Sequence, residues 1–238
     1  MIGIANTGER ILLEKETPLM IARHFCAYRL AKDYVLNKDI LDLGCGEGYG
    51  SYFLAGFAKK VRAIDYDKEI INYAKTKYQK DNLAFYAIDV RDPSLFGNKF
   101  DAICSFQVIE HIPDTKIFLG YVKSSLAENG IFICSTPNKL DASPHSDTPF
   151  NKFHVREYLI NEFKELLGTY FSRVELFGLK RGKQLNFYRR LKKTGLFNFF
   201  PPFINPVKLF YGRIDCGNFI IVKNKLVAAL DLIAVCSG

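Results

Sequence analysis

The chain has 238 residues, of which 48% are hydrophobic, and a formal net charge of +8, which suits one α/β domain with an insertion. Charged residues are spread through the first twenty positions and no long apolar run occurs, so we expect neither a signal peptide nor a membrane span and place the protein in the cytoplasm. The six cysteines include no C-x-x-C pair, which favours buried, reduced thiols over a zinc site.

The positive charge is concentrated in one segment. Between Glu175 and Asp215 there is no acidic residue. The segment carries nine positive charges: Lys180, Arg181, Lys183, Arg189, Arg190, Lys192, Lys193, Lys208 and Arg213. Because the net charge is +8, the rest of the chain sums to about −1 and is close to neutral.

The order of predicted elements indicates a parallel sheet. Near Thr17 an amphipathic helix begins, with apolar residues at helical spacing from Ile21 to Val35. The pattern then predicts strands at 40–43, 61–64, 83–87, 100–105 and 130–135, and helices at 49–58, 67–79 and 115–127. This alternation implies right-handed crossovers and a sheet covered on both faces.

The last third of the chain allows more than one assignment of its final strand. A helix is predicted over 151–168 and a sixth strand over 172–178, with a further helix around 184–193. Two segments, 218–222 and 230–235, are candidates for the final strand.

The most informative motif follows the first predicted strand. The apolar run from Ile40 to Leu43 ends in a turn with glycine at positions 44, 46 and 48. Glycine allows the tight turn and the close approach of a ligand, and the next helix offers its N-terminus to polar ligand groups. Asp65 lies 19 residues after Gly46, where a carboxylate can accept both hydroxyl hydrogens of a ribose. The dinucleotide motif G-x-G-x-x-G would need a glycine in place of Tyr49.

The G-x-G-x-G spacing resembles motif I of the class I S-adenosylmethionine (SAM) methyltransferases. Three further segments match that family in order: Tyr86–Val90, Gln107–Asp114 and Asn129–Asn138. The resemblance covers about residues 7–180 and implies a doubly wound, Rossmann-like, seven-stranded and mostly parallel sheet with SAM as cofactor. It also favours 230–235 as the last strand, antiparallel beside the sixth. The expected single domain then comprises an N-terminal cap (1–37), a SAM-binding core (38–179), a basic aromatic insert (180–216) and a C-terminal strand (217–238).

The resemblance implies a set of cofactor-binding residues: Arg10, Tyr28, Asp42, Gly44, Cys45, Gly46, Gly48, Asp65, Tyr66, Asp89, Val90, Phe106 and Gln107. In the family, the acid corresponding to Asp89 binds the adenine amino group, and Arg10 or Tyr28 could cap the SAM carboxylate. Asp42 could instead order the glycine loop, and Asp89 could be a turn or N-cap residue.

Two histidines are candidate catalytic residues, and no motif for a metal is evident. His111 follows the fourth strand, where it could take the proton of a hydroxyl acceptor or make a structural hydrogen bond. His154 lies in Phe153-His154-Val155-Arg156-Glu157-Tyr158, which resembles an element of a methyltransferase subfamily often associated with glycan and natural-product biosynthesis. It could reach the pocket or contact a helix N-terminus, and residues 138–150 would form a flexible rim over the acceptor.

The function expected from these features is O-methylation of an anionic acceptor, such as a peptide carboxylate, a carboxylated metabolite or a glycan precursor. The family's amide and amine N-methyltransferases commonly carry an N-P-P-Y-type segment where this chain has Ser105-Phe106-Gln107-Val108. RNA methylation and a SAM-binding module without catalysis are the alternatives. The insert could be a solvated face, a nucleic-acid patch or an acceptor-docking element; its interleaved aromatics and the lack of an RNA-binding module favour docking.

Overall fold

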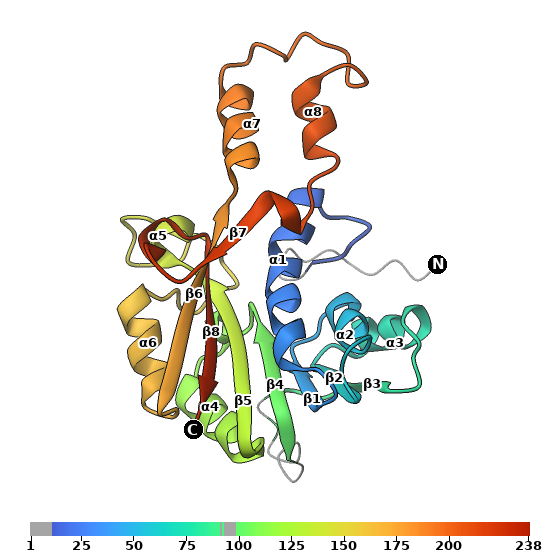
Figure 1. Cartoon of the computed structure of the whole chain (residues 1–238), viewed down its shortest axis with the longest axis vertical. Helices are drawn as coiled ribbons and strands as arrows, with labels where there is room; N and C mark the ends of the chain where they lie inside the picture. The colour runs from blue at the N-terminus through green and yellow to red at the C-terminus, as the bar shows by residue number, and fades with distance from the viewer. Residues whose placement is uncertain (1–10, 91, 93–98) are drawn as a thin grey trace.

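The computed structural model describes residues 11–90, 92 and 99–238. An eight-stranded sheet in the order β3-β2-β1-β4-β5-β8-β6-β7 forms its centre (Figure 1). The strands are β1 (Asp39–Leu43), β2 (Lys60–Asp65), β3 (Leu83–Ala87), β4 (Phe100–Phe106), β5 (Leu126–Pro137), β6 (Arg173–Arg181), β7 (Phe219–Val222) and β8 (Asp231–Ser237). The helices are α1 (Pro18–Ala31), α2 (Tyr49–Leu54), α3 (Lys68–Lys77), α4 (Thr115–Ser125), α5 (Lys139–Ala142), α6 (Ile160–Gly168), α7 (Lys183–Lys193) and α8 (Pro206–Tyr211).

Strand direction confirms the doubly wound, mostly parallel fold. Strands β1 to β5 pair in parallel, and β8 lies antiparallel between β5 and β6. Both candidates for the last strand are strands: 230–235 corresponds to β8, and 218–222 corresponds to β7, which pairs with the edge of β6. The sheet therefore has one strand more than the seven expected from the sequence.

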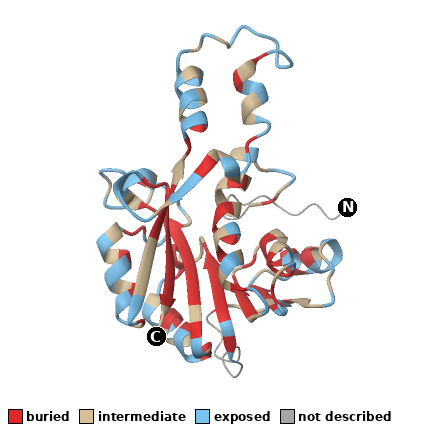
Figure 2. Cartoon of the chain, viewed as in Figure 1, coloured by how far each residue is buried: buried red, intermediate tan, exposed pale blue. Residues whose placement is uncertain are grey.

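Side chains alternate across β1 and fill two separate cores, as the two-residue period of a strand requires. Leu41 and Leu43 belong to a cluster that includes α4 and α6 residues, whereas Ile40 belongs to one with α1 and α2 residues. The strands in the middle of the sheet are accordingly buried on both faces (Figure 2). Within the described residues, no helix is long and apolar enough to cross a membrane.

One predicted helix begins later than expected. The prediction of a helix over 151–168 is wrong for its first nine residues, since α6 starts at Ile160. The amide groups of Val155 and Arg156 donate to the carbonyl of Glu110 instead of to a helical turn. Tyr158 forms a parallel bridge with Asn138. Long-range hydrogen bonds thus hold residues 151–159 as a loop across the end of β4.

The basic insert projects from the body as a helical hairpin. Helix α7 covers the predicted 184–193 segment and is followed by a connection and by α8. Strand β6, which runs parallel to β1–β5, leads directly into α7. The hairpin therefore lies on the side of the sheet where the parallel strands have their carboxyl ends (Figure 1).

Candidate functional site

A cavity of about 530 Å³ lies at the carboxyl ends of β1, β2 and β4. This is where the strand order reverses, β1 being flanked by β2 and β4, and ligands of doubly wound sheets bind at such points. The predicted residues that line it are Tyr28, Gly44, Cys45, Gly46, Asp65, Tyr66, Asp89, Val90, Phe106, Gln107, His111 and His154. Asp42 and Gly48 are not part of its lining, and Arg10 lies outside the described residues.

The three glycines of the loop are required by backbone conformation. Gly44, Gly46 and Gly48 have φ angles of +75°, +53° and +93°, a region that side chains with a Cβ rarely adopt. A Cβ at Gly44 would lie 2.4 Å from the side chain of Val108, whereas one at Gly46 would meet nothing within 4 Å. The backbone at Gly46 therefore faces open space in the cavity wall, as a cradle for a closely approaching ligand.

Asp65 connects the end of β2 to the glycine loop. One carboxylate oxygen accepts the amide hydrogen of Gly46 at 3.0 Å, and the other accepts that of Asp67 at 3.1 Å. The carboxylate is 7% exposed and borders the cavity. The glycine loop and Asp65, which the sequence spacing associates, are thus joined by a hydrogen bond.

Asp42 lies beneath the loop instead of in the cavity wall. Its Oδ2 accepts hydrogen bonds from the hydroxyl groups of Ser51 at 2.6 Å and Tyr28 at 3.3 Å. Burial raises the pKa of this carboxyl to about 7. Its Oδ1 is buried without a hydrogen bond among the described residues. These contacts favour the loop-ordering role for Asp42 and bind it to Tyr28 of the cavity lining.

His111 is fixed by the loop that crosses the end of β4. It lies in a 3-10 turn, η3 (Ile109–His111), and its Nδ1 is 2.9 Å from the carbonyl oxygen of Phe153. A carbonyl can only accept, so Nδ1 carries the hydrogen and the lone pair of the neutral ring is on Nε2. The segments containing His111 and His154, separate in the sequence, are therefore joined in the fold.

His154 is held on both sides of its ring. Its Nδ1 is 2.8 Å from Glu157 Oε1, and its Nε2 is 3.0 Å from Asn151 Nδ2. Because Asn151 Oδ1 accepts the Phe153 amide hydrogen, the NH₂ group of Asn151 is the part that faces His154. The ring therefore donates to Glu157 and accepts from Asn151. His111 and His154 pack edge to face, with centroids 5.0 Å apart.

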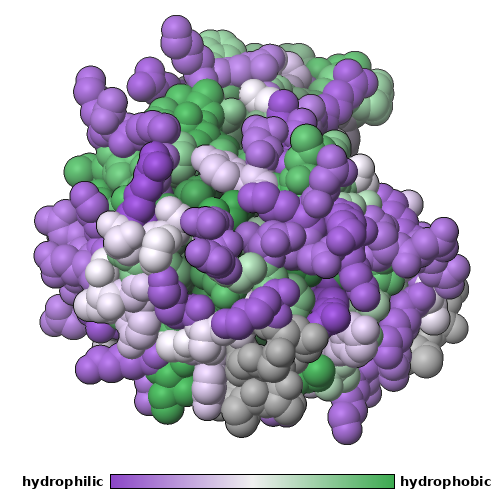
Figure 3. Space-filling view, turned by 60° about the horizontal axis from the view of Figure 1, so that its bottom comes forward, coloured by the Kyte–Doolittle hydropathy of each residue, from purple (hydrophilic) through white to green (hydrophobic). Residues whose placement is uncertain are grey.

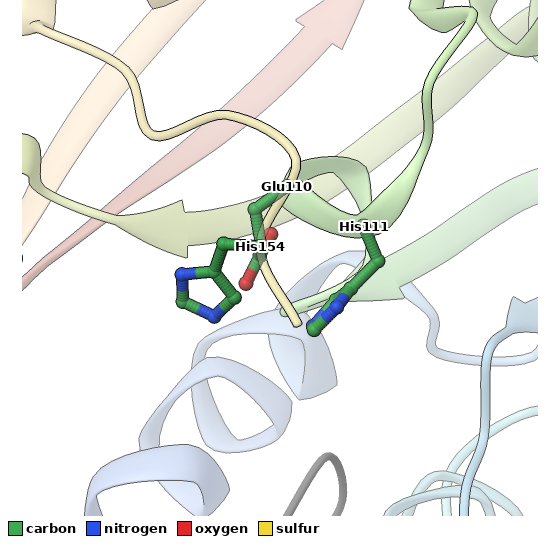
Figure 4. A group of neighbouring side chains, drawn as sticks. All are labelled: Glu110, His111 and His154. Carbon is green, nitrogen blue, oxygen red and sulfur yellow. The ribbon is translucent and has the colours of Figure 1, made fainter. Parts of the chain in front are cut away.

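Glu110 lies beside the two histidines with its carboxyl group buried (Figure 4). Neither of its oxygens makes a hydrogen bond within the described part of the chain, and burial raises its pKa to about 8. One potential ligand atom each from Glu110, His111 and His154 lies within 4.8 Å of the others. Since both His154 nitrogens already have partners, a cation bound there would have to displace Asn151 or Glu157.

Three residues to which the sequence assigns no site role also line the cavity, and for one of them, His24, the sequence favours an ordinary helix contact. His24 of α1 lines the cavity, and burial lowers its pKa to about 4, so the ring is neutral. Arg23 makes a two-point ion pair with Asp231 of β8 at 2.6 and 2.8 Å. Glu47 is 1% exposed and accepts hydrogen bonds from Leu13 and from two α3-region side chains, so it anchors the N-terminal segment. The partners are distant in sequence, so no local pattern signals these roles.

A family model described as a methyltransferase domain matches residues 36–185. The chain belongs to this methyltransferase family. The matched range contains the glycine loop, Asp65, Asp89, His111 and His154, and it ends just inside α7.

Relatives agree with this assignment. A Mycolicibacterium smegmatis protein named "Probable S-adenosylmethionine-dependent methyltransferase" is 35% identical over 68% of this chain and 63% of its own length. A ubiquinone biosynthesis O-methyltransferase from Pelagibacter ubique is 32% identical over 43% of each chain. The chain thus spans less than two thirds of the length of either relative, 63% of the first and 43% of the second. A SAM-dependent methyltransferase structure from Thermotoga maritima, with 11% identity, has the same fold, with a TM-score of 0.63 over 96% of both chains.

The cavity of this methyltransferase domain fits SAM. Its volume of about 530 Å³ is within the range of small-molecule sites, roughly 300–1,000 Å³. The backbone at Gly46 leaves space for close approach. Acidic side chains outnumber the single Arg23 in the lining, which suits a ligand that carries a sulfonium and an ammonium group.

Proposed function

We propose that the protein is an enzyme that binds SAM and transfers its methyl group to an oxygen of an anionic acceptor. The observation that carries the proposal is the convergence, in one cavity at the switch point of the sheet, of the glycine loop, two acidic residues and His111. The family membership of residues 36–185 supports it.

Each cofactor group has a candidate partner. Asp65 accepts the ribose hydroxyls, Asp89 binds the adenine amino group, and the backbone at Gly44 and Gly46 approaches the amino-acid end. Phe106 and Gln107, at the end of β4, border the reacting end. Bound SAM supplies an electrophilic methyl carbon, so the protein's task is to align the acceptor and to exclude water.

His111 is the proposed base for a hydroxyl acceptor. Its Nδ1 is engaged with Phe153, which places the basic lone pair on Nε2, the atom able to accept the acceptor's proton. His154, held by Glu157 and Asn151, keeps this loop and the His111 ring in place. A carboxylate acceptor would need only this positioning and no proton transfer.

Oxygen is favoured over nitrogen as the accepting atom for two reasons. The segment at the end of β4, Ser105-Phe106-Gln107-Val108, lacks the N-P-P-Y pattern of amide and amine methyltransferases. The relative from Pelagibacter ubique is named as an O-methyltransferase. The negative charge of the acceptor is inferred from the acid-free, cationic insert on the site's side of the sheet.

The cofactor assignment is tested by isothermal titration calorimetry with SAM. Asp65→Ala removes a charged hydrogen-bond acceptor worth about 1.5–3 kcal/mol and should weaken binding by roughly 10- to 100-fold. Asp81→Ala, which changes an exposed acid before β3, is the matched control and should bind SAM as the parent does. Unchanged affinity in a folded Asp65→Ala protein would refute the assignment.

A further inference from the structure

The connection between α7 and α8, residues 194–205, exposes an apolar surface that the proposed chemistry does not use. It contains no charged residue. Leu196, Phe199 and Phe203 are 64%, 94% and 75% exposed, and Phe200 and Ile204 are also largely exposed. We call this segment the apolar tip; it lies at the far end of the hairpin from the sheet (Figure 1).

The exposure is built into the hairpin, because its two helices pack together and its connection is held by hydrogen bonds. Tyr188 of α7 and Phe210 of α8 stack at 4.0 Å with an interplanar angle of 8°. Asn205 is 2% exposed, caps α8 with its side-chain oxygen and donates from its amide to the carbonyl of Phe197. A connection held in this way presents its phenylalanines outward while the two helices remain together.

Cations flank the apolar tip along the chain. The exposed residues Arg189, Arg190, Lys192 and Lys193 precede it, and Lys208 and Arg213 follow it. In the described part of the chain none of these six forms a salt bridge; Lys192 packs over the ring of Tyr211. Toward the top of Figure 3, apolar areas gather among hydrophilic side chains.

From these features we propose that the α7–α8 hairpin docks on the surface of an anionic lipid bilayer. Phenylalanines bury well at the boundary between headgroups and acyl chains, and nearby lysines and arginines are attracted to anionic lipid phosphates. An uncharged aromatic tip carried by two helices that bear exposed cations matches both the acyl boundary and the charged headgroups of such a surface. A second copy of the chain fits less well, because it would bring two sets of cations together.

The inference rests on the proposed function and extends it. The anionic partner of the insert is then a lipid surface, and the acceptor is presented at that surface. The hairpin and the cavity lie on the same side of the sheet, so docking would turn the cavity mouth toward the bilayer. Vesicle binding can be measured without turnover, so its failure and a failure of methyl transfer are distinguishable.

The chain has no tryptophan, so one introduced residue reports on its own surroundings. Phe203→Trp places the reporter in the apolar tip, and Tyr86→Trp places it on the exposed face of β3 at the other edge of the sheet. With vesicles of phosphatidylcholine and phosphatidylglycerol, the emission of Phe203→Trp should shift to the blue and that of Tyr86→Trp should not. Vesicles of phosphatidylcholine alone should produce a much smaller shift, and added salt should weaken binding.

Co-sedimentation gives the second measurement. The double variant Phe199→Ser/Phe203→Ser should lower partitioning into the anionic vesicles by about tenfold or more, with SAM affinity unchanged as the control for folding. Parent protein that stays in the supernatant, with no shift in Phe203→Trp, overturns the proposal. Concentration-dependent self-association lost in the double variant, or salt-sensitive binding to an RNA oligonucleotide, in either case without vesicle binding, would assign the tip to those partners instead.

Discussion

His111 and His154 lie in contact, yet their hydrogen bonds give them different expected roles. Nδ1 of His111 faces a carbonyl oxygen and therefore carries the hydrogen, so Nε2 is the basic atom of the neutral ring; the ring of His154 donates to Glu157 and accepts from Asn151. If the acceptor is a hydroxyl, His111→Ala should lower kcat by roughly 10²- to 10⁴-fold, as loss of a general base does. SAM affinity should hold, and single-turnover kinetics would measure the effect.

The neighbouring residue supplies the comparison. His154→Gln should reduce kcat less and should raise the acceptor KM, because it loosens a loop without removing the base. Full turnover in His111→Ala at every pH would remove this residue from the mechanism.

Glu110 should make the stability of the protein depend on pH. Its pKa is raised from 4.5 to about 8 by burial, so the folded state retains a proton that the unfolded chain releases. The stabilisation contributed by the protonated carboxyl is complete below the pKa of Glu110 in the unfolded chain. It is lost as pH rises through the pKa of Glu110 in the folded protein. Glu110→Gln stays neutral and lacks this loss.

Urea denaturation at a series of pH values measures the difference. Between about pH 5 and pH 8, the free energy of unfolding of the parent should fall relative to Glu110→Gln by a few kcal/mol. Asp42, whose pKa is also raised, is present in both proteins, so its contribution to the pH dependence of stability cancels in the comparison. Parallel pH profiles for the two proteins would show that the carboxyl is not buried as described.

At the scale of elements, the Arg23–Asp231 pair links α1 to β8. The side chains are 18% and 5% exposed, so an unpartnered Asp231 would remain largely out of water. Arg23→Ala should therefore lower the free energy of unfolding by about 3 kcal/mol. Arg29→Ala, at an exposed position of the same helix, should change it by less than about 0.5 kcal/mol. Equal effects in the two variants would contradict a specific link.

Elements with a strong local signal were predicted well from the sequence. The helix expected to begin near Thr17 is α1, and the runs before the glycine loop and before Asp65 are β1 and β2. The loop at 151–159 was predicted wrongly because its conformation depends on the carbonyls of Glu110 and on Asn138, which are distant in sequence. The apolar pattern of residues 218–222 correctly predicted a strand. Periodicity alone does not show whether that strand is added at the edge of the sheet or takes the place of 230–235 as the last strand.

The same distinction applies to the site. The acids and glycines of the cavity could be predicted because each follows a strand end, and parallel strand ends meet at one edge of the sheet. The roles of Glu47 and Arg23 could not, since they depend on partners in other elements. For Asp42 the sequence allows both a cofactor role and a loop-ordering role; its burial, at 0% exposed, and its hydrogen bonds to Ser51 and Tyr28 favour the second.

For the whole molecule, the distribution of charge predicts how the acceptor binds. Reversing Arg189, Arg190, Lys192 and Lys193 to Glu should raise the acceptor KM while SAM affinity stays unchanged, because the cofactor cavity is built from other elements. Added salt should raise the KM of the parent, since exposed charges are screened over about 8 Å at physiological ionic strength.

Lys60→Glu, at the exposed beginning of β2, changes a cation on the amino-terminal side of the sheet and should leave the KM as it is. Steady-state kinetics at several salt concentrations would compare the variants. An acceptor KM that responds neither to charge reversal nor to salt would show that the hairpin cations form a solvated face and do not bind the acceptor.

The position of β8 has a consequence for synthesis of the protein. It is the last strand of the chain, yet it pairs with β5 on one side and β6 on the other. As the polypeptide leaves the ribosome, β5 and β6 therefore have unpaired edges until β8, which follows them in the chain, emerges. Unpaired edges invite association with other chains. The nascent protein thus has an interval, about as long as translation of β6 to β8, in which a chaperone would be most useful to it.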